Sequence, residues 1–190
     1  MKKISIIGGM SWHSTAEYYR LINEGVQKKL GRLHSAKIIL ASVDFAEIVE
    51  LQHHNEWDKA GEILANHALR LQQAGADFIV IATNTMHISV PIMEQLINIP
   101  ILHIADATAD TILNAGINTA GLLGTRFTMQ MDYYTSRLSE RGLKVLIPKD
   151  EECQRVNQVI FDELCLGTIN PQSKQEYLTI IDGLRIKGAQ

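Results

Sequence analysis

The sequence predicts an α/β protein made of two similar α/β lobes with mainly parallel sheets. Short apolar runs alternate with longer amphipathic segments along the chain, which is the order of a parallel α/β fold. The run Phe78–Ala82 (FIVIA) is apolar at every position and is typical of a strand buried on both faces of its sheet. The segments Ile6–Tyr19 and Gly121–Tyr134 resemble each other, which indicates an internal repeat.

The first half of the chain carries a signal for each expected element. Gly8 and Gly9 let the chain turn after the first strand, Ser14 or Thr15 is placed to cap the next helix, and Gly75 ends the second long helix. The order of strands and helices implies a parallel sheet with right-handed crossovers. The expected elements are a strand at Lys3–Gly8, a helix through Tyr18 and Val26, a strand at Lys37–Ser42, a helix at Glu56–Ala74 and a strand at Phe78–Ala82.

The second half continues the same alternation. Proline is tolerated in the first turn of a helix, and Asp106 is placed to cap another. The expected helices are Ser89–Ile97, Ala107–Ala115, Thr125–Arg141, Glu151–Leu166 and one from Pro171 or Ser173 to about Ile186. The expected strands are Ile101–Ile104, Thr119–Gly124 and Leu143–Ile147.

The repeat divides the chain into a first lobe at residues 1–100 and a second lobe at residues 101–190. The matching pairs are Gly9 with Gly124, Tyr18-Tyr19 with Tyr133-Tyr134, and the helix end Leu71–Gly75 with Leu184–Gly188. In the first lobe that helix end leads into an apolar strand. We therefore expect a further strand after Gln190, so the second lobe is expected to be incomplete at its C-terminal end.

Composition and charge narrow the possible functions. The net charge is −3 with no basic run, which argues against nucleic acid as a partner. No apolar stretch approaches the roughly 18 residues of a membrane span, and no signal peptide is visible. Cys153 and Cys165 show no metal-ligand spacing and no disulfide pattern. We expect a cytoplasmic protein without a bound metal.

Three small polar residues follow the apolar run at Phe78–Ala82 and are the first candidates for a binding site. Thr83, Asn84 and Thr85 are placed at the carboxyl end of a buried strand, where parallel sheets bind ligands. Their hydroxyls, an amide and a following helix N-terminus suit a small anion such as a carboxylate. The alternative is an ordinary helix start capped by Thr85. The turn after Gly9 lacks the glycines of a dinucleotide fingerprint.

Several segments together resemble the aspartate/glutamate racemases over essentially the whole chain. They are IGGMSWHST, SVDFAEI, EWDKAGEIL, ATNTMH, LHIADAT, LLGTRFTM and DELCLGTI, and the branch they resemble acts on L-aspartate or L-glutamate. The resemblance implies two lobes facing each other across a central cleft, a homodimer, and an acidic amino acid as substrate. It also implies racemisation without a cofactor, in which two groups, usually cysteines, remove and return the α-proton from opposite sides.

The resemblance assigns roles to residues of this chain. Thr83 stands where the first catalytic cysteine is expected, and the second cysteine belongs to a Gly-Cys-Thr motif expected after Gln190. Gln52 stands where an arginine is expected to bind the substrate carboxylate, and Leu166 stands where a lysine is common. The expected substrate-binding residues are Met10, Ser11, Gln52, Thr83, Asn84, Thr85 and Thr125.

These residues lead to a primary hypothesis and two alternatives. The primary hypothesis is an amino-acid racemase for aspartate and glutamate, inactive as the 190-residue chain because the second cysteine is absent. The first alternative is an acidic amino-acid-binding protein without catalysis, and the second is another reaction on the same scaffold, such as decarboxylation. His87 is expected to be structural more often than functional, and Trp12 and Cys165 are expected to pack in the core.

Overall fold

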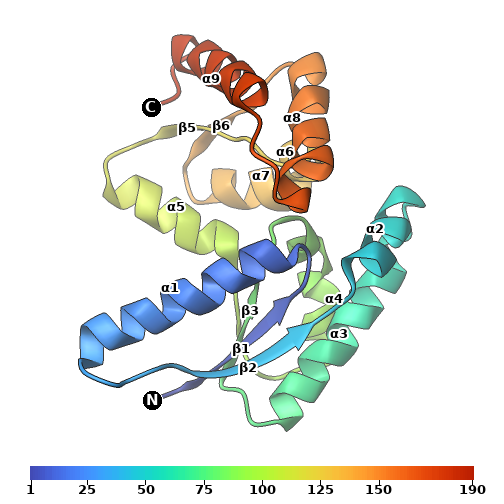
Figure 1. Ribbon diagram of the computed structural model, residues 1–190, viewed down its shortest axis with the longest axis vertical. Coiled ribbons are helices and arrows are strands. Elements are labelled where there is room, and N and C mark those ends of the chain that lie inside the picture. The colour runs from blue at the N-terminus through green and yellow to red at the C-terminus, as the bar shows by residue number, and fades with distance from the viewer. The chain divides into compact units, whose positions relative to one another are not determined.

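The structure of the protein is a computed structural model that describes residues 1 to 190. It divides into two compact units, Met1–Ile104 and Ala105–Gln190 (Figure 1). Both units contain parallel strands and helices, as the sequence predicts. None of the helices combines the length and the apolar character that a membrane span requires.

The first unit contains a four-stranded parallel sheet with the strand order β2-β1-β3-β4. The bounds of these strands are Lys3–Gly8 for β1, Lys37–Ser42 for β2, Phe78–Ile81 for β3 and Ile101–Leu102 for β4. The chain leaves β1 toward one edge of the sheet and returns from β2 toward the other. Right-handed crossovers therefore require helices on both faces of this sheet.

The helices of the first unit cover those two faces unequally. Figure 1 shows α1 (Trp12–Leu30) on one side of the strands and α3 (Trp57–Gln73) on the other. The α3 face holds the core, in which Leu64, Ile79 and Ile81 are fully buried. The opposite face is less well covered, since Leu40 and Leu102 are about half exposed. The remaining helical segments of this unit are α2 (Phe45–His53), the 3₁₀ helix η1 (Thr85–Ser89) and α4 (Val90–Glu94).

The second unit is built on two parallel strands, β5 (Thr119–Gly121) and β6 (Lys144–Leu146). Its core includes Met129, Cys153, Val156 and Ile180. Its helices are α5 (Ile104–Asn114), which begins at the boundary between the units, α6 (Arg126–Gln130), α7 (Asp132–Glu140), α8 (Asp150–Asp162), the 3₁₀ helix η2 (Leu164–Leu166) and α9 (Pro171–Ile186).

The predicted match between the two helix ends is present in the backbone. Gly75 after α3 and Gly188 after α9 have positive φ angles of 82° and 102°, which glycine adopts without steric cost. Each next residue donates back into its helix, Ala76 to Leu71 at 3.2 Å and Ala189 to Leu184 at 3.1 Å. The chain then bonds to a strand in both units, Asp77 N–H to the Lys3 carbonyl and Gln190 N–H to the Thr119 carbonyl.

Several helix predictions are wrong in their bounds. The helix expected at Thr125–Arg141 is two helices, because Met131 between them is extended with ψ of 143°. The helix expected at Glu151–Leu166 ends at Asp162 and is followed by η2. The helix expected at Ser89–Ile97 is η1 followed by the short α4. In each case the spacing of apolar residues is compatible with one continuous helix, but the chain makes a local turn instead.

The predicted helix caps are also corrected by the structure. α1 begins at Trp12 with Ser11 as its N-cap residue, so Ser14 and Thr15 lie inside the helix. Asp106 lies in the first turn of α5 and does not cap it. Its carboxylate instead accepts two hydrogen bonds from the Arg137 guanidinium on α7, both at 2.8 Å. This bidentate pair links α5 to α7 within the second unit.

Candidate functional site

Two turns at the carboxyl ends of neighbouring strands form the candidate site. β1 and β3 are parallel neighbours with Ile7 opposite Ile81, and the Ala82 N–H donates to the Ile7 carbonyl at 2.8 Å. The segments that follow, Gly8–Ser11 and Thr83–Thr85, therefore begin side by side at the same edge of the sheet. We call these two segments the paired turns. Parallel α/β sheets bind ligands at this edge.

The hydroxyls of Ser14 and Thr15 on α1 hold the paired turns together. Ser14 Oγ lies 2.7 Å from the Ala82 carbonyl oxygen and 2.9 Å from the Ser11 carbonyl oxygen, so it bridges both strand ends. Thr15 Oγ1 accepts a hydrogen bond from the Gly9 N–H at 2.8 Å. These side chains, expected as helix caps, act as links between the helix and the turns. Their position immediately after a glycine turn was the signal for this role.

Gly9 is required by the geometry of the first turn. Its φ angle is 97°, a conformation that side-chain-bearing residues rarely adopt. A Cβ atom at this position would also collide with the backbone of Val43 after β2. The Val43 N–H in turn donates to the Gly8 carbonyl at 3.0 Å. The turn is therefore fixed against β2 as well as against α1.

The second turn presents two side chains that have no partner within the protein. The Thr83 hydroxyl makes no hydrogen bond to another group of the chain, and the residue is partly buried. The Asn84 Oδ1 atom is buried without a hydrogen-bond partner. Thr85 is almost fully buried. Because buried polar atoms are nearly always paired, the unpartnered Asn84 oxygen indicates a binding position at this turn.

The His87 ring stabilises this turn through hydrogen bonds to its backbone. Its Nδ1 lies 2.8 Å from the Thr83 carbonyl oxygen and 3.2 Å from the Asn84 carbonyl oxygen. Its Nε2 accepts from the Ile104 N–H at 3.2 Å, so Nδ1 carries the proton and the ring is neutral. With both nitrogens bound to backbone groups and 2% exposure, His87 is structural, as expected.

A 3₁₀ helix, and not an α-helix, begins directly after the second turn. It spans Thr85–Ser89, Asn84 stands at its N-cap position, and no side chain caps it. The alternative, in which Thr85 is an ordinary helix cap, is therefore wrong. The polar groups that the turn offers are its side chains and its own backbone N–H groups.

Met10 and Gln52 are placed near the turns but are buried. The Met10 side chain belongs to the hydrophobic core, with 3% exposure, so the first turn offers its backbone at this position. Gln52 lies in the last turn of α2, is 5% exposed, and donates through Nε2 to the Met86 sulfur at 3.1 Å. This bond fixes α2 to the segment that follows Asn84. Neither residue supplies a positive charge to the site.

Thr125 belongs to the second unit and is the N-cap of α6. Its hydroxyl accepts from the Thr128 N–H at 3.3 Å and lies 3.2 Å from the Thr128 hydroxyl. Its position after β5 matches that of Ser11 after β1, since Ser11 is the N-cap residue of α1. The two units therefore use the same element order around these two positions.

Neither cysteine is prepared to act as a base. Burial and the nearby carboxylates of Asp150 and Glu152 raise the pKa of the Cys153 thiol, which lies in the core of the second unit. Burial also raises the pKa of the Cys165 thiol in η2. Cys165 is only partly buried, so the expectation that it packs in the core is corrected. A raised pKa disfavours the thiolate, which is the reactive form.

Trp12 is exposed, contrary to expectation. It begins α1 beside the first turn, has 63% of its surface exposed, and stacks on the His13 ring with centroids 3.8 Å apart. The prediction rested on the usual burial of large aromatic side chains. A helix start at the sheet edge points this side chain outward, and residue type alone gives no indication of that.

The fold is that of an α/β protein with parallel sheets, and the paired turns form a candidate small-molecule site at the carboxyl edge of one sheet. Residues 7–190 match the family model of Asp/Glu/hydantoin racemases. The chain belongs to this family, and the family expected from the sequence is confirmed.

Individual relatives agree with this assignment. RacX of Bacillus subtilis, a broad specificity amino-acid racemase, is 29% identical over 162 residues, covering 83% of this chain and 69% of RacX. A Yersinia pestis structure assigned to the Asp/Glu racemases has a TM-score of 0.92 and 49% identity, covering 100% of this chain and 83% of that one. An aspartate racemase homologue from Pyrococcus horikoshii has a TM-score of 0.82 and 36% identity, covering 100% and 82%.

Proposed function

We propose that this protein is a cofactor-independent amino-acid racemase for aspartate and glutamate that removes and returns the proton of the α-carbon. Membership of the racemase family supports the reaction class. Aspartate is supported by the similarity to an aspartate racemase homologue, and a wider substrate range by the similarity to RacX. We also propose a cytoplasmic homodimer, for which light scattering of the purified protein is the test.

The observation that carries the proposal is the unpartnered Asn84 oxygen at the paired turns. An amino acid brings an ammonium group, which needs acceptors, and a carboxylate, which needs donors. We assign the ammonium group to Asn84 Oδ1. We assign the carboxylate to the backbone N–H groups of the two turns, which would also stabilise charge that develops during proton transfer.

The chemistry of Thr83 in this proposal is that of a proton donor. No side chain of the protein accepts a hydrogen bond from its hydroxyl, so nothing activates it as a base. A neutral hydroxyl nevertheless delivers a proton readily to a carbanion, which is a far stronger base than an alkoxide. We propose that Thr83 faces the α-carbon on one side and passes its proton to it, and that solvent water then returns a proton to the threonine oxygen. A different group removes the α-proton from the other side.

Substitution of Asn84 tests the binding assignment. Titration of ¹⁵N-labelled protein with L-aspartate is expected to shift the amide signals of the paired turns, and Asn84→Ala is expected to weaken binding about tenfold, the effect of losing roughly one charge-assisted hydrogen bond. Asn98→Ala is the matched control, because its side chain is exposed in the same unit. Unchanged affinity in Asn84→Ala would contradict the assignment.

A binding protein without catalysis is the second candidate function. It is favoured by the absence of any group that activates Thr83 and by the raised pKa values of both thiols. The two candidates differ in one measurement, the formation of D-aspartate from L-aspartate by the protein as the cell makes it. Racemisation supports the enzyme, whereas binding without racemisation supports the second candidate.

A further inference from the structure

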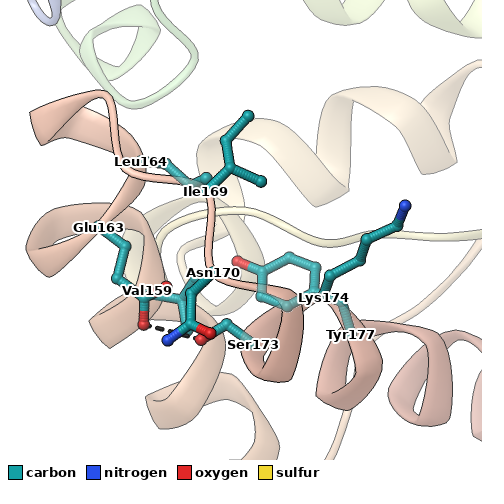
Figure 2. Close-up of a pocket in the computed structure, with 8 residues that line it drawn as sticks. All are labelled: Val159, Glu163, Leu164, Ile169, Asn170, Ser173, Lys174 and Tyr177. Carbon is teal, nitrogen blue, oxygen red and sulfur yellow. Dashed lines mark hydrogen bonds between the residues drawn. The ribbon is translucent and has the colours of Figure 1, made fainter.

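A cavity of about 220 Å³ lies entirely within the second unit, between the end of α8, η2 and the start of α9 (Figure 2). The residues that line it include Val159, Glu163, Leu164, Ile169, Ser173 and Tyr177. The paired turns belong to the first unit, so no residue of the candidate site lines this cavity. Its size is sufficient for a small organic ligand, since an engineered cavity of roughly 150 Å³ binds benzene.

The walls of the cavity are mostly hydrocarbon. Val159 is buried, while Leu164 and Ile169 are exposed at 44% and 81%, so apolar surface faces solvent at the mouth. The ring of Tyr177 forms another wall, and its hydroxyl is occupied by a hydrogen bond to the Val156 carbonyl at 3.1 Å. These walls favour a ligand with an aliphatic body.

One carboxylate in the wall is incompletely paired. Glu163 Oε1 accepts a hydrogen bond from the Ser173 hydroxyl at 2.8 Å, which Figure 2 shows as a dashed line. Glu163 Oε2 is buried and has no partner. A buried acceptor without a donor destabilises the fold, and more strongly when the group is charged. Glu163 is one of the residues that line the cavity, so a ligand donor that reached Oε2 from there would remove this destabilisation.

The nearby cations do not fill that position. The Arg155 guanidinium lies 3.9 Å from Glu163 Oε1, because its Nε donates to Glu176 at 2.6 Å and its Nη2 donates to Ser173 at 3.2 Å. One arginine is thus shared between two carboxylates. Lys174 is exposed, and Figure 2 shows its amine extending away from the Glu163 carboxylate.

We propose that this cavity binds a small primary alkylammonium ion. Its charged N–H group donates to Glu163 Oε2, and its hydrocarbon body lies against Val159, Leu164 and Ile169. A charge-assisted hydrogen bond of this kind is about twice as strong as a neutral one. An anion would be repelled by the carboxylate, and a neutral hydrocarbon would leave Oε2 without a donor.

The probe for this proposal is 3-methylbutylamine at neutral pH, with 3-methylbutan-1-ol as the uncharged probe of nearly the same shape. Titrations of the full ¹⁵N-labelled protein are expected to shift signals of Glu163, Ile169 and Ser173 with the amine, which should bind at least tenfold more tightly than the alcohol. No binding of the amine, or equal binding of the two probes, overturns the proposal.

Carboxylate-to-amide variants locate the recognition group. Glu163→Gln keeps the shape of the side chain but places an N–H donor or a neutral oxygen in the cavity, and is expected to weaken amine binding at least tenfold. Asp162→Asn removes the neighbouring exposed charge, which does not line the cavity, and is expected to leave binding unchanged. Equal affinity of the Glu163→Gln and wild-type proteins overturns the proposal.

Two further variants keep the test decisive. Ile169→Ser shortens an exposed wall residue that folding does not depend on, so weakened amine binding is expected even if Glu163→Gln fails to fold. Asn84→Ala is expected to retain amine binding, which separates this site from the paired turns. Unchanged binding in Ile169→Ser, or lost binding in Asn84→Ala, contradicts the proposed site.

Discussion

Single side chains decide what the paired turns can bind. The turns offer hydroxyls, an amide oxygen and backbone N–H groups, and the residues named there carry no positive charge. Gln52, in the place where the resemblance expects an arginine, is neutral and uses its Nε2 on Met86. Selectivity for an acidic substrate therefore lacks the cation that usually provides it.

The Cys153 thiol is expected to lower the free energy of unfolding as the pH becomes alkaline. Its pKa is raised in the fold, mainly by burial, so the folded chain keeps the thiol proton to a higher pH than the unfolded chain. The resulting stability is fully present below the unfolded value of about 8.5 and is lost as the pH rises through the folded value.

Urea unfolding between pH 7.5 and 9.5 measures this effect. Wild-type stability is expected to fall more steeply with pH than that of Cys153→Ser, by up to roughly 1.4 kcal/mol per pH unit, because one titrating thiol is removed. Comparing slopes cancels the constant cost of replacing a buried sulfur. Parallel slopes in the two proteins would show that Cys153 does not titrate on unfolding in this range.

At the scale of elements, α1 and β3 are joined through one hydroxyl. Ser14 lies within hydrogen-bond distance of the carbonyl groups of Ala82 and Ser11, which end the strand and the turn of the candidate site. Ser14→Ala is expected to lower the free energy of unfolding by about 1 kcal/mol and to weaken L-aspartate binding, because the paired turns lose their shared link.

Calorimetry and urea unfolding of the same samples check both effects of Ser14→Ala. Ser35→Ala, an exposed loop position in the same unit, is the control and should change neither quantity. A variant that loses stability but binds L-aspartate as tightly as the wild type would show that the link supports the fold alone.

The existence of the elements was predictable, but only some of their ends were. The strand Phe78–Ile81 follows from an apolar run, and Gly75 and Gly188 mark helix ends because only glycine adopts their backbone conformation cheaply. The break at Met131 was not predictable, since apolar spacing continues across it. Tertiary packing decides whether the chain continues a helix or makes a turn at such a position.

For the whole molecule, the site residues that follow a strand directly were predictable from the sequence, and those that depend on distant partners were not. Thr83–Thr85 follows a strand directly, so its place at the sheet edge was predictable. Ser14 was assigned as a cap because its partner, the Ala82 carbonyl, lies 68 residues away along the chain. The burial of Met10 and the exposure of Trp12 depend on how α1 leaves the sheet, and residue type does not encode that.

The proposed racemisation depends most on the position of Thr83 relative to the α-carbon of the substrate. A threonine hydroxyl is a poor base, whereas a cysteine thiol with a pKa near 8.5 reaches its reactive thiolate near neutral pH. Thr83→Cys restores the residue that the resemblance expects. Exchange of one α-proton with solvent requires a base on one side of the substrate only.

The most direct measurement is deuterium incorporation at the α-carbon of L- and D-aspartate in D₂O, followed by NMR for the wild-type and Thr83→Cys proteins. We predict that Thr83→Cys exchanges the α-proton of one enantiomer at least about tenfold faster than the wild type, as expected for a competent general base. A Thr83→Cys protein that binds aspartate but exchanges no faster would show that residue 83 does not face the α-carbon.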